Sequence, residues 1–418
     1  MSILQLPFIS VQSDWQQVVQ EVASGTIPET SFWIACYVAG KPSIQGSIRV
    51  IKKEEENFEL EGRDGFSVSL IDSHMFKVEC SDSGIRDIIV HGPRTEIPLA
   101  EKASISCVDV SPNARLFAAV SRSSIMVGNI AVGEIQKTLT GHLNDVTVVQ
   151  FFPSNLVLLS AGADFQLKIW SVLDGSNPVT LKGHKSAITS TAIIEKGRNI
   201  LSSSRDGTIK LWNCGTSSVI ATLGNYKTPI NKMILAKLPP TYQPAQTDNL
   251  ESNEVGTEDK LVLVALGDGS VHGIHLGTRA ELFASQKNEH ALTALAYDEA
   301  SSLVFTGNDH GQICIYALTR GLKEPLVKWQ RNKSPITSLV LKLSRNGDSV
   351  LCISSADGGL YQTSSLATIY EPKPKIYVEV EYTGNDLETI SDMKVLPSEK
   401  EEYQHIVCGV RDGKVKIY

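Results

Sequence analysis

The chemistry that this sequence could perform is concentrated in a histidine, a serine and an aspartate that occur together twice. In each set a tryptophan follows six residues after the aspartate. The two sets are His142, Ser160, Asp164 and Trp170, and His184, Ser202, Asp206 and Trp212. Serine, histidine and aspartate are the nucleophile, base and orienting acid of many hydrolases. However, no Gly-x-Ser-x-Gly turn surrounds either serine, and a triad has no use for the tryptophan, so we favour a structural role.

In that structural role, the residues form a buried chain of hydrogen bonds from tryptophan through serine and histidine to aspartate. Every member must be paired, because an unpaired buried polar group costs about 1–3 kcal/mol. The two sets lie in segments 141–170 and 183–212, which align without a gap and share eight identical residues. Self-similarity at this period, 42 residues, is typical of the blades of a β-propeller.

Five further segments carry the same pattern of an apolar run, a tight turn and an alternating strand. Asp-Gly is common in such turns, because both of its positions tolerate positive φ. The turn positions of the seven units are Arg122, Asp164, Asp206, Asp268, Asp309, Asp357 and Asp412. We therefore predict a mainly β fold, a seven-bladed β-propeller over residues 86–418.

Two irregularities in the repeat have local explanations. Residues 238–259 are rich in Pro, Gln, Asn and acidic residues without a period, so we expect an acidic disordered insert. The insert could attract a basic partner, although a solvated loop is the simpler interpretation. The chain ends at Tyr418, in the third strand of its last unit. Because a blade has four strands, we expect residues 87–99 to supply the fourth and close the ring.

Residues 1–85 follow a different pattern, which predicts a small N-terminal α+β domain. Apolar residues with helical spacing predict an amphipathic helix at 13–25, with Ser13 and Gln16 as a capping box. Alternating segments then predict strands at 31–39, 46–53, 58–62, 66–72 and 75–81.

Composition excludes several classes of function. The net charge is −7 and there is no dense Lys/Arg run, which does not favour nucleic-acid binding. Seven scattered cysteines without Cys-x-x-Cys spacing indicate reduced thiols, as in the cytoplasm or nucleus. No apolar run approaches transmembrane length, so we expect no membrane partner. No phosphate-binding loop is present, and His272 and His275 would face opposite sides of a strand, so we expect no cofactor or metal.

The repeats resemble the WD-repeat β-propeller class, and most of the chain resembles the proteasomal ATPase-associated factor family. The second resemblance rests on the dense match at 139–215, on "SDW" near the N-terminus, and on "GKPSIQGS", "EVGTE" and the terminal "CGVRDGKVKIY". It implies a monomeric, non-enzymatic assembly chaperone. Such a protein binds the C-terminal domains of ATPase (base) subunits of the 26S proteasome regulatory particle and prevents premature docking onto the core particle.

Residues beside the blade turns are our candidates for contact with a partner. They are Asp145, Thr147, Arg205, Asn308 and Arg411. Two other functions stay open. One is a scaffold or substrate receptor in a ubiquitin ligase, with the N-terminal domain as second docking site. The other is an enzyme that uses the central channel, where Asp109 and Asp392 are the main titratable residues expected on innermost strands.

Overall fold

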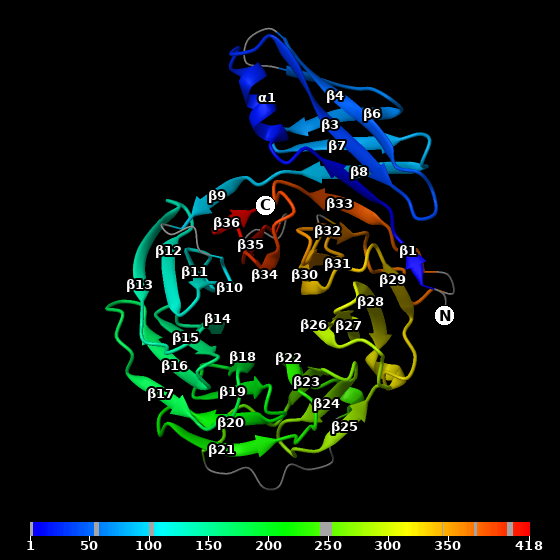
Figure 1. The fold of residues 1–418 in the computed structure, drawn as a ribbon. Helices are drawn as coiled ribbons and strands as arrows, with labels where there is room; N and C mark the ends of the chain where they lie inside the picture. The colour runs from blue at the N-terminus through cyan, green and yellow to red at the C-terminus, as the bar shows by residue number, and fades with distance from the viewer. Residues whose placement is uncertain are drawn as a thin grey trace.

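The computed structural model describes residues 3–53, 58–99, 104–242, 253–344, 346–371, 374–398 and 404–418. Within these residues the chain is mainly β-strand, with one α-helix, α1 (Trp15–Ala23), and two 3-10 helices, η1 (Pro240–Tyr242) and η2 (Leu318–Arg320). Antiparallel sheets stand around a central opening like the blades of a propeller, as Figure 1 shows. The mainly β propeller fold expected from the repeats is confirmed.

The first ring sheets follow one another along the chain. Their strands are β10 (Cys107–Val110), β11 (Leu116–Ser121), β12 (Ser124–Asn129) and β13 (Glu134–Leu139); β14 (Val146–Phe151), β15 (Val157–Gly162), β16 (Gln166–Ser171) and β17 (Val179–Lys182); β18 (Ile188–Ile194), β19 (Asn199–Ser204), β20 (Ile209–Asn213) and β21 (Ser218–Leu223); β22 (Ile230–Lys237), β23 (Lys260–Leu266), β24 (Val271–His275) and β25 (Glu281–Ala284). The first strand of each sheet lies innermost (Figure 1). In β18 every second side chain is buried, as its alternating sequence ITSTAII requires.

The remaining ring sheets each gain strands from the N-terminal part of the chain. Their own strands are β26 (Leu292–Asp298), β27 (Leu303–Asn308), β28 (Gln312–Ala317) and β29 (Val327–Gln330); β30 (Ile336–Leu343), β31 (Ser349–Ser355), β32 (Leu360–Thr363) and β33 (Val378–Tyr382); β34 (Ile390–Val395), β35 (Ile406–Val410) and β36 (Lys414–Ile417). The added strands are β1 (Leu4–Gln5) on β29, β8 (Ile85–His91) with β7 (Met75–Cys80) and β6 (Phe66–Asp72) on β33, and β9 (Thr95–Pro98) on β36.

The ring is closed by strand exchange between the two ends of the chain. Strand β9 pairs antiparallel with β36, with Ile97 opposite Val415 and Pro98 opposite Lys414. The second half of the segment expected at 87–99 thus completes the last sheet. Its first half belongs to β8, which pairs parallel with β33 of the preceding sheet, an arrangement that the repeat pattern did not indicate.

The N-terminal part has its own sheet, formed by β2 (Phe8–Val11), β3 (Glu29–Tyr37), β4 (Ile44–Lys52) and β5 (Phe58–Gly62). The bounds of β3, β4 and β5 lie within two residues of those expected, whereas β2 was not expected. The expected capping box is wrong: Asp14 is the N-cap residue of α1, and Ser13 Oγ instead donates to Asp386. Strand β8 crosses the expected domain boundary between residues 85 and 86, and the division into two domains stays a proposal.

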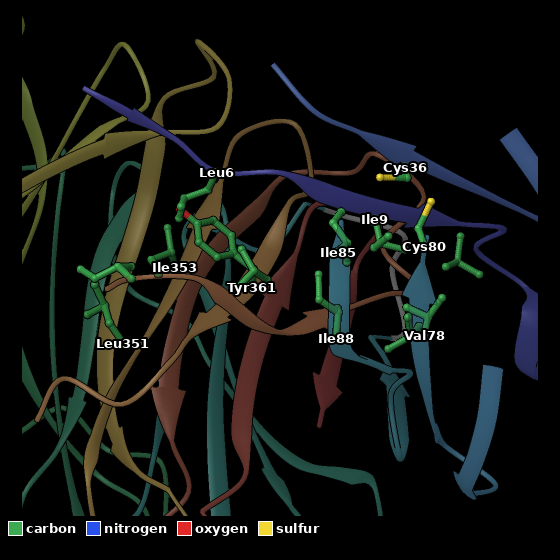
Figure 2. Close-up of a cluster of buried hydrophobic side chains, with 14 of the residues drawn as sticks. Leu6, Ile9, Cys36, Val78, Cys80, Ile85, Ile88, Leu351, Ile353 and Tyr361 are labelled. Carbon is green, nitrogen blue, oxygen red and sulfur yellow. The ribbon is translucent and has the colours of Figure 1, made fainter. Parts of the chain in front are cut away.

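One apolar core joins the N-terminal sheets to the ring. It contains residues of β2, α1, β3, β7 and β8 together with residues of β27, β31 and β32. Figure 2 shows part of this cluster, with Leu351 and Ile353 at one end and Val78 and Cys80 at the other. Because burial of apolar surface stabilises by about 25 cal/mol per Å², this shared core holds the N-terminal part against the ring.

The two described ends of the segment at 238–259 are packed, contrary to the expected solvated insert. Tyr242 donates its hydroxyl hydrogen to Leu318 O at 2.9 Å. The Glu254 carboxylate is buried and forms an ion pair with Arg279. The expected disorder of residues 243–252 falls outside the described residues.

Candidate functional site

The first set of repeated polar residues forms a continuous chain of hydrogen bonds. Trp170 Nε1 donates to Ser160 Oγ at 2.8 Å, and Ser160 Oγ lies 2.7 Å from His142 Nε2. His142 Nδ1 lies 2.8 Å from Asp164 Oδ2. Strands β15 and β16 are paired with Ser160 opposite Lys168 and Trp170 opposite Leu158, so Ser160 and Trp170 are diagonal neighbours, and the turn between the strands carries Asp164.

The second set repeats this geometry one sheet further on. Trp212 Nε1 donates to Ser202 Oγ at 2.8 Å, and Ser202 Oγ lies 2.8 Å from His184 Nε2. His184 Nδ1 lies 2.9 Å from Asp206 Oδ2. The structure therefore brings together all eight residues that the sequence grouped, four in each sheet.

Protonation and burial decide what these networks can do. Burial lowers the pKa of both His142 and His184, so both imidazoles are neutral near pH 7. Burial alone would raise the pKa of Asp206, but hydrogen bonds from Lys185 N–H and Thr208 outweigh it and lower the pKa to about 2. Each neutral imidazole then donates to a carboxylate and accepts from a serine hydroxyl. Because Ser160 and Ser202 are 0% exposed, no substrate can reach either hydroxyl.

The turns that carry the repeat positions lie between the second and third strands of the ring sheets. Aspartate side chains stabilise several of these turns by accepting from the backbone two residues on, as Asp164 does from Gln166 and Asp412 from Lys414. The first unit has Arg122 here, with a left-handed φ of 53°. We place the candidate functional site on the face of the propeller formed by these turns.

Four of the five candidate contact residues are exposed, although Thr147 lies on the innermost strand β14 and lines the central cavity. They are Asp145, Thr147, Arg205 and Arg411. Asn308 differs from the expectation, because it is only 6% exposed. Its Oδ1 accepts hydrogen bonds from the backbone of His310 and Gln312, so it stabilises its own turn instead of presenting a side chain to a partner.

Thr147 also belongs to a series of hydrogen bonds between neighbouring sheets that the repeat pattern did not predict. Its hydroxyl donates to Ile188 O, the first residue of the innermost strand in the next sheet. Equivalent links between neighbouring sheets are Ser106 to Val146 O, Thr189 to Ile230 O, Asn231 to Leu292 O and Thr293 to Ile336 O. The sequence could have indicated these hydrogen bonds, because Thr147 and Thr189 occupy one of the eight identical positions of the two aligned repeats.

The central channel contains a cavity of about 430 Å³, lined by the innermost strands. Asp109 Oδ2 accepts from Phe151 N–H at 2.7 Å, and Asp392 accepts from Val108 N–H, so both carboxylates connect neighbouring sheets. Burial raises the pKa of Asp109 to about 6. No group of three or more side chains among the described residues is arranged to hold a metal ion. No helix in the described ranges is long and apolar enough to cross a membrane.

The propeller with its two Trp-Ser-His-Asp networks defines a protein of the WD-repeat class. The family described as "WD domain, G-beta repeat" matches residues 133–171 and 175–213, which contain the networks. The chain is 31% identical over 345 residues to the probable proteasomal ATPase-associated factor 1 of Dictyostelium discoideum. That match covers 79% of this chain and 80% of the relative. The chain therefore belongs to the proteasomal ATPase-associated factor 1 family.

Two further relatives match over shorter segments. Proteasomal ATPase-associated factor 1 of Gallus gallus is 32% identical over 150 residues, which are 35% of this chain and only 36% of that protein. The 26S proteasome regulatory subunit RPN14 of Saccharomyces cerevisiae is 56% identical over 36 residues, 9% of each chain. The match to the Gallus gallus protein spans only about a third of that protein's length. The activity and the partners of this chain are therefore proposals.

Proposed function

We propose that this protein is an assembly chaperone for the 26S proteasome regulatory particle. It binds ATPase subunits of the base through their C-terminal domains and limits their premature docking on the core particle. It does so as a monomeric, non-enzymatic platform without a cofactor, in the cytoplasm and nucleus.

The observation that carries this proposal is the 31% identity to a proteasomal ATPase-associated factor over most of both chains. That relative's name associates it with proteasomal ATPases. The geometry supports a platform, because the serines of both Ser-His-Asp sets are buried, while Asp145, Arg205 and Arg411 are exposed to solvent. Exposed charges on a rigid face are suited to selecting a partner of complementary charge.

The experiment is a pull-down from cell extract with the purified full-length chain, analysed by mass spectrometry and on native gels. We expect ATPase subunits in free base subcomplexes, with little intact 26S particle. Recovery of cullin or adaptor subunits would instead indicate a ubiquitin-ligase receptor, and recovery of neither class would contradict both functions.

Reversal of two opposite charges tests whether Asp145 and Arg205 contact the ATPase subunits. Asp145→Lys together with Arg205→Glu keeps the net charge, and we expect capture of ATPase subunits to fall at least tenfold. Glu134→Lys together with Lys182→Glu is the matched control, because both residues are exposed on outer strands. Equal capture by the two double variants would remove Asp145 and Arg205 from the contact surface, and equal melting temperatures establish that both variants are folded.

A further inference from the structure

A second cavity, of about 410 Å³, lies between the N-terminal sheet and the ring. One wall follows β2 along four successive residues, 8–11, and β2 is the edge strand of its sheet. Phe8 stacks on Tyr37 with ring centroids 4.5 Å apart, and Trp33 on the same wall is 48% exposed. An edge strand that lines a cavity over several successive residues is a common docking place for an extended peptide.

The inner wall of this cavity contains one ion pair that is already complete. The side chains of Arg331 and Glu381 are 9% and 6% exposed and pair with each other, and Glu381 also accepts from Ile9 N–H at 3.2 Å. The Arg331 guanidinium lies over the Tyr361 ring, 4.2 Å from its centroid. The positive charge of Arg331 is therefore neutralised by the Glu381 carboxylate.

Two further carboxylates line the cavity without a cationic partner in the described part of the chain. Asp357 accepts from Asn332 Nδ2 at 2.7 Å, and Asp386 accepts from Ser13 Oγ at 3.2 Å. These neutral donors leave both negative charges in place. The lining as a whole has one arginine and three acidic residues, and therefore attracts a cation.

The outer rim is a loop held in an unfavourable backbone conformation. Asp386 and Leu387 are successive non-glycine residues with left-handed φ values of 49° and 63°. Each such residue costs about 1 kcal/mol or more. This conformation leaves the Leu387 side chain 84% exposed. A large apolar group held in solvent beside a cavity is suited to contact with an apolar side chain of a ligand.

Asn385, the preceding residue, anchors this loop to the last residue of the ring. It lines the cavity and is only 4% exposed, and its Oδ1 accepts from Tyr418 Oη at 3.0 Å. Its Nδ2 has no hydrogen-bond acceptor among the described residues. That nitrogen is enclosed by the fold, and Tyr418 Oη also donates to Thr383 O at 2.9 Å, so the Asn385 amide helps to fix the rim loop and does not itself contact a ligand.

We propose that this cavity binds an extended peptide segment that carries a lysine or arginine next to an apolar residue. The basic side chain pairs with Asp357 and Asp386, and the apolar residue packs between Trp33 and Leu387. The site lies between the N-terminal sheet and the ring, and the proposal holds whichever protein carries the segment.

The test uses two photo-crosslinking peptides on the full-length chain, acetyl-Gly-photoleucine-Lys-Val-Gly-amide and the same peptide with Glu in place of Lys. We expect the Lys peptide to label residues 383–389 or the β2–β3 wall at least tenfold more than the Glu peptide does. Equal labelling by the two peptides, or labelling confined to other surfaces, would overturn the proposal.

Variants separate this site from non-specific attraction. Asp357→Asn with Asp386→Asn should reduce labelling by the Lys peptide at least tenfold, and Trp33→Ala should reduce it severalfold. Glu289→Gln is the control, because Glu289 is an exposed carboxylate outside the lining. Because the probes contain no proteasomal subunit, this result does not depend on the outcome of the pull-down. Cavity-dependent dimerisation of the chain, with no labelling by either peptide, would assign the surface to self-association and refute the peptide site.

Discussion

The hydroxyl of Ser202 links two other buried side chains of its sheet. It accepts from Trp212 Nε1 and lies within hydrogen-bond distance of His184 Nε2, and all three side chains are buried. Every polar group in this network is paired, as a buried network must be if it is to stabilise one structure. His91 is the opposite case, a buried histidine whose two ring nitrogens have no partner among the described residues.

Replacing Ser202 by alanine leaves both Trp212 Nε1 and His184 Nε2 unpaired in the core. We expect Ser202→Ala to lower the free energy of unfolding by about 1–3 kcal/mol, measured by urea denaturation. Ser218→Ala, an exposed serine on the outer strand of the same sheet, is the control and should change it by less than about 0.5 kcal/mol. A loss in Ser202→Ala no larger than that of the control would show that the network contributes no stability.

His91 predicts a loss of stability in acid. Burial, reinforced by the positive charges of Arg94 and Lys342, lowers the pKa of His91 from 6.5 to about 3. Between these values the unfolded chain binds a proton that the folded chain excludes, so the contribution is neutral above pH 6.5 and increasingly unfavourable as the pH falls toward 3. We expect His91→Leu to weaken the decline in urea stability between pH 6.5 and pH 4. The difference in the free energy of unfolding between the His91→Leu variant and the parent chain at pH 8 is the reference. If that difference is the same at pH 4, His91 does not cause the loss of stability in acid.

At the scale of elements, strand β9 decides whether the ring is closed. It is four residues long, but it supplies the outer edge of the last sheet, and Ile97 is buried against the core of that sheet. Deleting the whole of 87–99 would also remove most of β8 and with it the pairing to β33. A single substitution in β9 therefore tests closure more cleanly.

Ile97→Ala removes apolar contacts at the seam and leaves a cavity. We expect the free energy of unfolding to fall by about 2–5 kcal/mol, measured by chemical denaturation. Thr95→Ala in the same strand is the control, since Thr95 is exposed and its backbone pairing with Ile417 is retained. If both variants unfold at the same urea concentration as the parent chain, β9 does not hold the ring closed.

At the scale of the whole molecule, the N-terminal part crosses the outer edges of three consecutive sheets. Strand β1 pairs with β29, β8 with β33 and β9 with β36. The helix α1 adds a fourth contact, because Trp15 Nε1 donates to Thr383 Oγ1 at 2.8 Å. The N-terminal part thus stabilises the side of the ring that contains the closing seam.

Removing the Trp15 side chain should loosen this attachment without opening the opposite side of the ring. We expect Trp15→Ala to speed amide hydrogen exchange in β8 and in residues 383–389, while β14 to β17 keep their protection. Gln17→Ala on the exposed face of α1 is the control. Unchanged exchange at 383–389, or equally faster exchange throughout the ring, would show that α1 does not act as a local attachment.

Several features could be predicted because their causes are local. The bounds of β5 and β6 follow from alternating side chains, and the turns at Asp164 and Asp206 follow from residue type. Other features could not be predicted. Asn308 is next to the repeat position Asp309, so the sequence predicts a surface residue. Its Oδ1 instead accepts hydrogen bonds from backbone N–H groups of its own turn.

The sequence by itself determined the repeated blade and its Trp-Ser-His-Asp network, because periodicity and spacing encode contacts within one repeat. Only the tertiary structure decided that β8 extends the sheet of β33, that Glu254 is buried against Arg279, and that Asn385 lines a cavity. These contacts join segments far apart in the chain. Their energies depend on which surfaces meet, and no local pattern of residues specifies that.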